Sequence, residues 1–304
     1  MTTPLRRRRF LQVLGATALL AACGDDGDGA AVSGTSISGS DDGAIPASSL
    51  LVGLFSTDRV IAAGIGQRLP LSVFDQERTP RRDEALPRTA EVVITRDGTT
   101  IGTEMVALHG LDLPLPYYPL RTTLPEPALY ELAIELDDGP ATMTVQAFDP
   151  ADVSVPQPEQ PMPSAATPTT GDARGVDPIC TRFEPCAFHA TSLDEALGSG
   201  PLAVLVGTPA YCQTGICGPV LEHLIAAAPR YPGIRFVHAE VWANPAEVDG
   251  NIADPRIRPA PVIEALRLSF EPVLFVVAAD GTVSDRLDNV FDQPELDQAL
   301  QQVS

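Results

Sequence analysis

From about Leu50 to Asp149, apolar and polar residues alternate with period two. The segment EVVITRDGTTIG predicts two strands joined at an Asp-Gly turn, and ALYELAIELDDGPATMTVQAFD predicts a second hairpin. In that second hairpin Tyr130, Leu132, Ile134 and Leu136 fall on one face. No segment in this region has helical periodicity. Residues 48–150 are therefore predicted to form a β-sandwich of short strands.

After Cys180 the pattern changes to alternating strands and helices. The runs LAVLVG and IRFVHAEVW are typical of strands buried on both faces, and GPVLEHLIAAAPRY has the spacing of an amphipathic helix. SLDEAL, APVIEALRL and QPELDQALQQV predict further helices, while PVLFVVAADG and TVSDRLDNV predict a hairpin. Residues 179–304 are thus predicted to be an α/β domain with the core order βαβαββα, in which a parallel strand pair precedes an antiparallel one.

Two stretches outside these domains have little to bury. Residues 24–47 are mostly Gly, Asp and Ser, which predicts a flexible tether. Residues 151–178 are rich in proline, which predicts a partly extended, semi-rigid linker. The sequence therefore places a domain boundary at the second stretch.

The N-terminus resembles a bacterial export signal. RRRRFLQ resembles the twin-arginine motif, and the apolar run after it is too short to span a bilayer. The run ends in LAAC, which resembles a lipobox. These resemblances imply that residues 1–23 are a twin-arginine lipoprotein signal peptide and that Cys23 is lipidated. The protein would then be exported and lipid-anchored to the outer face of the cytoplasmic membrane. A plain secretory signal with an incidental cysteine is the alternative.

Composition and charge exclude some partners. The chain has 304 residues, of which 44% are hydrophobic, as in globular proteins. Its 40 acidic and 20 basic residues give a formal net charge of −20. Such a surface repels nucleic acid and anionic lipid, so we expect no nucleic-acid partner, and the membrane association would rest on the lipid anchor. No cofactor is expected, and nothing in the sequence indicates an oligomeric state.

The loop TPAYCQTGICGPV, which follows the first buried strand of the α/β region, carries two cysteines five positions apart. In a continuous helix their Cα atoms would be about 8–9 Å apart, whereas a disulfide needs about 4.4–6.8 Å. Cys212 and Cys217 can therefore meet only if the chain folds back between them, which Gly215 permits. Pro219 fits a first helical turn, so Cys217 should lie at the helix N-terminus, where free N–H groups stabilise a thiolate. Its position predicts that Cys217 has the lower pKa, and the sequence context predicts that Cys212 is the more exposed. Which cysteine attacks a substrate and which resolves the mixed disulfide stays unassigned.

From about residue 197 to the C-terminus, the chain resembles the thioredoxin-like family. CGP, which begins at Cys217, matches the first three residues of the Cys-Gly-Pro-Cys site of that family. FEPVLFVV matches the segment that holds the family's cis-proline, which implies a cis bond before Pro272. Val220 replaces the second cysteine, and Cys212 stands upstream instead, as in exported bacterial thioredoxin-like proteins with a Cys-x4-Cys loop.

The predicted β-sandwich also resembles a known fold. LPEPALYELAIEL resembles the E–F corner of immunoglobulin-like domains, where a tyrosine follows a proline-rich turn. Together the two resemblances imply a multi-domain chain, with an N-terminal all-β immunoglobulin-like sandwich and a C-terminal α/β thioredoxin-like domain.

The thioredoxin-like resemblance implies a membrane-anchored, extracytoplasmic thiol–disulfide oxidoreductase. Cys212 and Cys217 would exchange with the thiols or disulfides of substrate proteins, and Pro272 would shape the docking groove. One alternative is a non-enzymatic binding or sensing lipoprotein with a disulfide-braced scaffold, because the usual second cysteine is missing. A lesser alternative is a peroxiredoxin-like peroxidase of the bacterioferritin-comigratory type. Its catalytic threonine would fall three residues before the first cysteine, where this chain has Pro209.

A second cysteine pair lies in CTRFEPCAFH, before the α/β domain. Cys180 and Cys186 are predicted to form a structural disulfide that holds the extension in place, although pairing with the central loop is an alternative. A zinc site built from Cys180, Cys186, His189 and one central cysteine would have enough ligands. Its spacing matches no common motif, so no metal is expected. His238 shares a strand face with apolar residues and is predicted to be an interior histidine.

Overall fold

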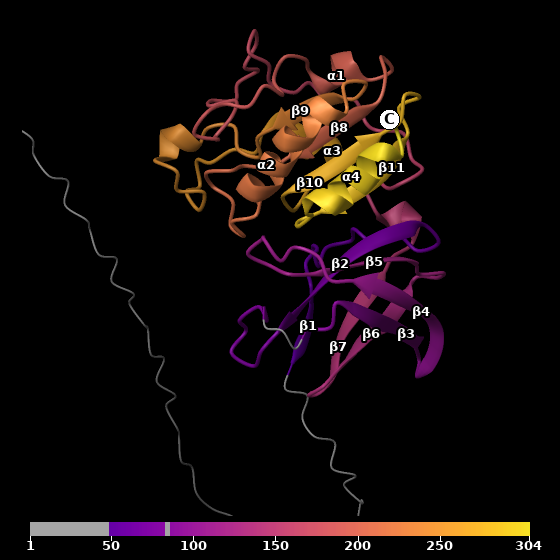
Figure 1. Cartoon of the computed structure of the whole chain (residues 1–304). Coiled ribbons are helices and arrows are strands. Elements are labelled where there is room, and N and C mark those ends of the chain that lie inside the picture. The colour runs from indigo at the N-terminus through magenta and orange to yellow at the C-terminus, as the bar shows by residue number, and fades with distance from the viewer. Residues whose placement is uncertain (1–48, 83–85) are drawn as a thin grey trace, which may run out of the picture. The chain divides into compact units, whose positions relative to one another are not determined.

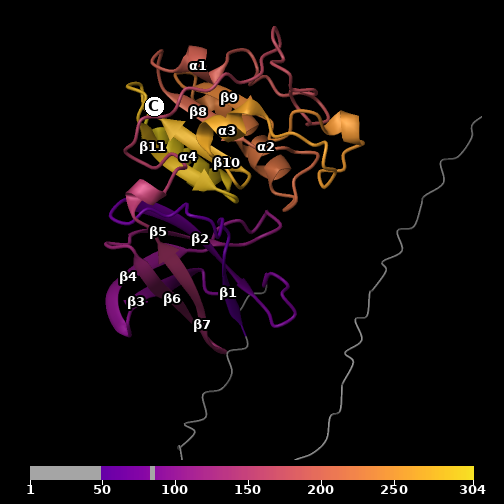
Figure 2. The same ribbon diagram turned by 180° about the vertical axis from the view of Figure 1, so that it is seen from behind.

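The computed structural model describes residues 49–82 and 86–304 (Figures 1 and 2). The predicted signal peptide, Cys23 and the tether lie outside these described residues. The described residues belong to one compact unit, which is built mostly of β-sheets with a few helices. Among them, none of the helices has the length and apolar character that a membrane span requires.

Two antiparallel sheets account for the region predicted to be a β-sandwich. One contains β1 (Leu50–Gly53), β2 (Gly66–Phe74) and β5 (Tyr118–Thr123), in the order β1-β2-β5. The other contains β3 (Thr89–Arg96), β4 (Thr99–Ala107), β6 (Ala128–Leu136) and β7 (Gly139–Ala147), in the order β4-β3-β6-β7. Both predicted hairpins, β3–β4 and β6–β7, are therefore confirmed.

Local sequence explains these hairpins. Asp97 and Gly98 have φ values of 50° and 74°, as the two-residue turn between β3 and β4 requires. Every second side chain of β6 from Tyr130 to Leu136 is buried, as the alternating pattern predicts. The Tyr130 hydroxyl donates a hydrogen bond to the carbonyl oxygen of Glu126 at 2.7 Å and accepts one from its N–H at 3.1 Å. This tyrosine thus holds the turn that leads into its own strand.

A third sheet, with four strands, forms the centre of the C-terminal part. It contains β8 (Leu202–Val206), β9 (Arg235–Ala239), β10 (Val273–Val277) and β11 (Val283–Asp288), in the order β11-β10-β8-β9. Strand β8 pairs parallel with β9, and the β8–β10 and β10–β11 pairs are antiparallel. The helices are α1 (Leu193–Ala196), α2 (Cys217–Ala227), α3 (Pro261–Leu266) and α4 (Gln293–Gln301). Short 3-10 turns cover Pro150–Asp152, Ala228–Arg230 and Pro245–Val248. From β8 to α4 the element order is the predicted βαβαββα.

Helices pack on both faces of this sheet. Leu205 of β8 belongs to the same apolar cluster as Leu221 of α2 and Leu296 of α4. Val204, the neighbour of Leu205, points to the opposite face and belongs to the cluster that contains Leu266 of α3. Because both faces are covered, every residue of β8 is buried, which explains why the strand reads as an unbroken apolar run.

Part of the proline-rich segment 151–178 pairs with the start of β11, the edge strand, and the segment packs on the folded chain instead of forming a free linker. The N–H of Glu159 donates to the carbonyl of Val283, and the N–H of Met162 donates to that of Gly281, both at 2.8 Å. Val155 and Met162 are buried in the apolar core. Apolar residues scattered between the prolines therefore give this segment enough to bury, and the edge strand supplies its hydrogen bonds.

A buried ion pair connects β2 with the last helix. Arg68 makes two hydrogen bonds to the carboxylate of Glu295, at 2.6 and 2.7 Å, and one to the carbonyl of Asp288 at 2.8 Å. The Tyr117 hydroxyl donates to the same carboxylate at 2.6 Å. The side chains of Arg68 and Glu295 are 0% and 1% exposed, so this contact between the two halves of the chain is fully shielded from water.

Candidate functional site

The loop between β8 and α2 folds back and brings Cys212 to the start of the helix. Gly215 has a φ of +70°, and its N–H lies 3.4 Å from the carbonyl oxygen of Cys212. The backbone N–H of Cys217, the first residue of α2, donates to the sulfur of Cys212 at 3.2 Å. The Thr214 hydroxyl lies 3.3 Å from the same sulfur. The chain reversal predicted from the sequence is confirmed.

The two thiols lie in opposite environments. Cys212 is partly exposed, and hydrogen bonds from Cys217 and Thr214 outweigh its partial burial and lower the pKa of Cys212 to about 5. Cys217 is 1% exposed. The hydrogen bond between its thiol and the Cys212 sulfur, then its burial and the nearby Glu271 carboxylate, raise the pKa of Cys217.

This result corrects one prediction and confirms another. The sequence predicted Cys217 to have the lower pKa because it begins the helix. That prediction is wrong, because the N–H group at the helix start points at the sulfur of Cys212, which accepts its hydrogen bond. The predicted greater exposure of Cys212 is confirmed. The partly exposed thiol is therefore also the more acidic one.

Glu271 and Pro272 lie beside the thiols, immediately before β10. The Glu271–Pro272 peptide bond is cis, as the sequence predicts. One carboxylate oxygen of Glu271 accepts hydrogen bonds from the Cys217 thiol at 3.5 Å and from the N–H of Thr208 at 3.0 Å. Burial, followed by repulsion from the Cys212 thiolate, raises the pKa of Glu271 to about 8. This carboxyl group can therefore exchange a proton with Cys217 near neutral pH.

Gly207 allows three segments to approach one another at this point. A Cβ atom on Gly207 would lie 3.2 Å from the Cβ of Pro272 and 3.6 Å from the sulfur of Cys217. The first distance is tighter than ordinary van der Waals contact, so a side chain here would displace the proline. The absence of a side chain at the end of β8 thus lets Pro272 and Cys217 pack together.

A hollow of about 390 Å³ opens beside the cysteine loop. Gln213 and Thr214 line its end nearest the thiols, and much of the remaining wall is apolar and includes Trp242 and Phe270. The indole N–H of Trp242 and the side-chain oxygen of Asn289, both in this wall, have no hydrogen-bond partner among the described residues.

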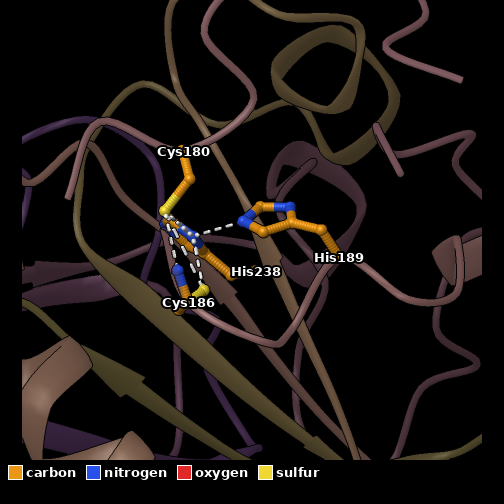
Figure 3. A group of neighbouring side chains, drawn as sticks. All are labelled: Cys180, Cys186, His189 and His238. Atoms are coloured by element: carbon orange, nitrogen blue, oxygen red, sulfur yellow. Dashed lines mark hydrogen bonds between the residues drawn. The ribbon is translucent and has the colours of Figure 1, made fainter. Parts of the chain in front are cut away.

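Cys180 and Cys186 meet as predicted, but as free thiols. Their sulfurs lie 3.9 Å apart, so the predicted disulfide is not formed in the structure. The ring nitrogen Nδ1 of His238 faces both sulfurs and the Cys186 N–H donates to the Cys180 sulfur, which holds them at contact distance. The fourth neighbour is His189 (Figure 3). The zinc site considered from the sequence had Cys212 or Cys217 as its fourth ligand. In the structure neither cysteine belongs to this group, and His238 takes the fourth place.

No family model and no curated protein matches the chain. Among solved structures, it is similar to a thiol:disulfide interchange protein of the thioredoxin family from Chlorobium tepidum TLS. The identity is 16%, the match covers 47% of this chain and 97% of that chain, and the TM-score is 0.32. It is also similar to the PKD domain of the human VPS10 domain-containing receptor SorCS2, with 14% identity and a TM-score of 0.20. That match covers 42% of this chain and 98% of that chain. Both TM-scores are low.

Proposed function

We propose that the protein is a membrane-anchored, extracytoplasmic thiol–disulfide oxidoreductase acting on substrate proteins. The observation that carries this proposal is the pairing of a partly exposed thiol of low pKa, Cys212, with a buried thiol at the start of α2, Cys217. Low pKa and exposure mark an attacking thiol, because the thiolate is the nucleophile. Export and the anchor on Cys23 rest on the resemblance of the N-terminal segment to lipoprotein signals.

We assign a thioredoxin-like fold to residues 179–304 and an immunoglobulin-like sandwich to residues 48–150. The strand order β11-β10-β8-β9, with a cysteine-bearing helix after β8 and a cis-proline before β10, supports the first assignment. The hydrogen bonds between the Tyr130 side chain and the backbone of Glu126 support the second, since tyrosine corners make this contact.

Reduction of a substrate disulfide would proceed in two exchanges. The Cys212 thiolate attacks one sulfur of the substrate disulfide, that bond breaks, and the other substrate sulfur leaves as a thiolate. Cys217 then loses its proton to Glu271 and attacks the Cys212 sulfur of the mixed disulfide. The second substrate thiolate leaves and takes up that proton. The substrate gains two electrons, and the protein ends with a Cys212–Cys217 disulfide. The same steps in reverse oxidise a substrate dithiol.

Glu271 couples these two exchanges. Repulsion from the Cys212 thiolate is one of the causes that raise the pKa of Glu271. When Cys212 becomes bonded to the substrate, its negative charge disappears and the pKa of Glu271 falls. The carboxylate that forms lies 3.5 Å from the Cys217 sulfur and can take its proton. The first exchange would thus prepare the base for the second.

The reduction potential of the Cys212–Cys217 pair tests the proposal. We expect the purified chain to reduce insulin and its cysteine pair to have a potential above about −300 mV, since structural bridges lie below that value. A Cys212→Ala/Cys217→Ala chain is the matched control and should not reduce insulin. A potential below about −300 mV, together with no insulin reduction, would instead identify the braced scaffold of a binding or sensing lipoprotein.

Replacing Glu271 with glutamine should slow the second exchange by about a hundredfold, because general base catalysis contributes about 10²–10⁴-fold. The rate of resolution of a preformed mixed disulfide is measured between pH 6 and pH 9. In the parent chain this rate rises as Glu271 ionises, with an inflection below pH 8, and in Glu271→Gln that inflection disappears. Glu222→Gln, on the exposed side of α2, is the control. An unchanged inflection in Glu271→Gln would remove this residue from the mechanism.

A further inference from the structure

Four buried side chains converge next to the cysteine loop but outside it (Figure 3). Cys180, Cys186 and His189 come from the segment before α1, and His238 comes from β9. One ligand atom from each residue lies within 4.8 Å of all the others. No side chain in the group is more than 8% exposed. Two thiols and two imidazoles are therefore enclosed together.

The separations between these atoms fit a tetrahedral metal ion. Zinc–sulfur bonds of about 2.3 Å and zinc–nitrogen bonds of about 2.0–2.1 Å place two sulfurs about 3.8 Å apart, two nitrogens about 3.4 Å apart, and a sulfur and a nitrogen about 3.6 Å apart. The sulfurs of Cys180 and Cys186 are 3.9 Å apart, and Nδ1 of His238 is 3.8 and 3.5 Å from them. Nε2 of His189 is 3.2 Å from Nδ1 of His238.

Hydrogen bonding fixes how His238 is oriented. Its Nε2 lies 3.0 Å from the carbonyl oxygen of Gly207. A carbonyl oxygen only accepts, so Nε2 carries a proton, and in the neutral imidazole Nδ1 directs its lone pair at the two sulfurs. Metal-binding histidines typically donate their second ring nitrogen to a carbonyl in this way. For His189, Nδ1 has no hydrogen-bond partner among the described residues. The contacts between side chains within the group join only sulfurs and ring nitrogens, which are the atoms that a metal ion would bind.

We propose that Cys180, Cys186, His189 and His238 form a structural Zn²⁺ site. Thiolate and imidazole ligands select zinc over magnesium or calcium, which prefer oxygen. Two thiolates and two neutral imidazoles balance the charge of a divalent ion, which offsets the cost of burying both thiolates. The four protein ligands complete a tetrahedron and leave no position for substrate, so the site is structural.

The ion would connect the segment before α1 to the central sheet. His238 holds the carbonyl of Gly207, and Gly207 is the residue against which Cys217 and Pro272 pack. The metal would therefore also stabilise the floor of the redox site without touching its thiols. This proposal does not depend on the proposed function, because the ligands and the exchanging cysteines are different residues.

Metal titration of the reduced, metal-free full-length chain tests the site. We expect one Zn²⁺ per chain by native mass spectrometry, and a Co²⁺-loaded chain with a thiolate-to-cobalt charge-transfer band and tetrahedral d–d bands. Cys186→Ser and His238→Ala should each weaken Zn²⁺ binding more than about a hundredfold, since losing even a supporting group costs about 10–100-fold. Cys212→Ser/Cys217→Ser, which removes the redox pair, should bind both metals as the parent chain does.

A second measurement keeps the test decisive if a ligand variant does not fold. Zn²⁺ should raise the thermal midpoint of the parent chain and of Cys212→Ser/Cys217→Ser alike, because it binds only the folded state. Arg182 lies between Cys180 and Cys186, so trypsin separates the two cysteines unless a disulfide joins them. Linked peptides from Cys212→Ser/Cys217→Ser, together with no cobalt–thiolate band after reduction, would overturn the zinc site and restore the structural disulfide.

Discussion

Replacing Cys212 with serine is expected to lower the rate of insulin reduction more than about a hundredfold, because it removes the attacking nucleophile. The pKa of Cys212 is about 5, so this thiol is almost fully ionised at neutral pH. Cys217 cannot replace it, since its burial keeps it out of reach of a protein substrate. Initial rates of insulin reduction under excess reductant measure the effect, and retained activity would contradict the assignment of Cys212 as attacker.

Replacing Cys217 should have a different outcome, which separates the two roles. In Cys217→Ser the first exchange still occurs, but the mixed disulfide is not resolved and accumulates as a covalent adduct visible by intact mass spectrometry. A serine hydroxyl at position 217 can still donate to the Cys212 sulfur. The pH midpoint for alkylation of Cys212 should therefore stay closer to pH 5 in Cys217→Ser than in Cys217→Ala. If Cys212→Ser accumulates the adduct instead, the roles are reversed.

Local sequence pattern predicted the elements well. The alternation from Tyr130 to Leu136 and the Asp-Gly turn between β3 and β4 are determined by neighbouring residues alone. The apolar run of β8 likewise indicates a strand covered on both faces. The fold-back of the cysteine loop follows from chain geometry and one glycine. These features were predictable because each is decided within a few residues.

Features decided by distant contacts were not predictable in this way. The order of the two pKa values depends on which sulfur accepts the N–H at the start of α2. Glu271 gave no signal beyond its place before the proline, and its role depends on burial beside Cys217. His238 has an ordinary place on a strand, and only the folded chain brings it to Cys180 and Cys186. A residue's chemistry at this site is thus determined mainly by neighbours far away in sequence.

Replacing Arg68 with methionine is expected to lower the free energy of unfolding by about 3–5 kcal/mol, because it removes the arginine that makes two hydrogen bonds to the buried Glu295 carboxylate. Denaturant or thermal unfolding of the full chain measures the loss. In Arg68→Met/Glu295→Leu much of it should be recovered, since an apolar pair carries no buried charge. Arg230→Met breaks a more exposed ion pair with Asp297, which lies on α4 like Glu295. It should leave the midpoint of unfolding nearly unchanged. Equal effects of Arg68→Met and Arg230→Met would contradict a shielded ion pair.

Acid should reduce the difference between the parent chain and Arg68→Met. Burial opposes ionisation of Glu295, but attraction and hydrogen bonds from Arg68 outweigh it and hold the pKa of Glu295 below its ordinary value. The contribution of a carboxyl group whose pKa is lowered on folding is fully present above its unfolded pKa, about 4.3, and is lost as pH falls through the folded value. Without Arg68, the burial that raises the pKa of Glu295 is no longer offset by the attraction and hydrogen bonds of that residue, so the group is protonated and uncharged in acid. The difference in unfolding free energy between the parent chain and Arg68→Met should therefore be widest near neutral pH and should narrow below about pH 4. A difference that is constant with pH would show that Arg68 acts through packing alone.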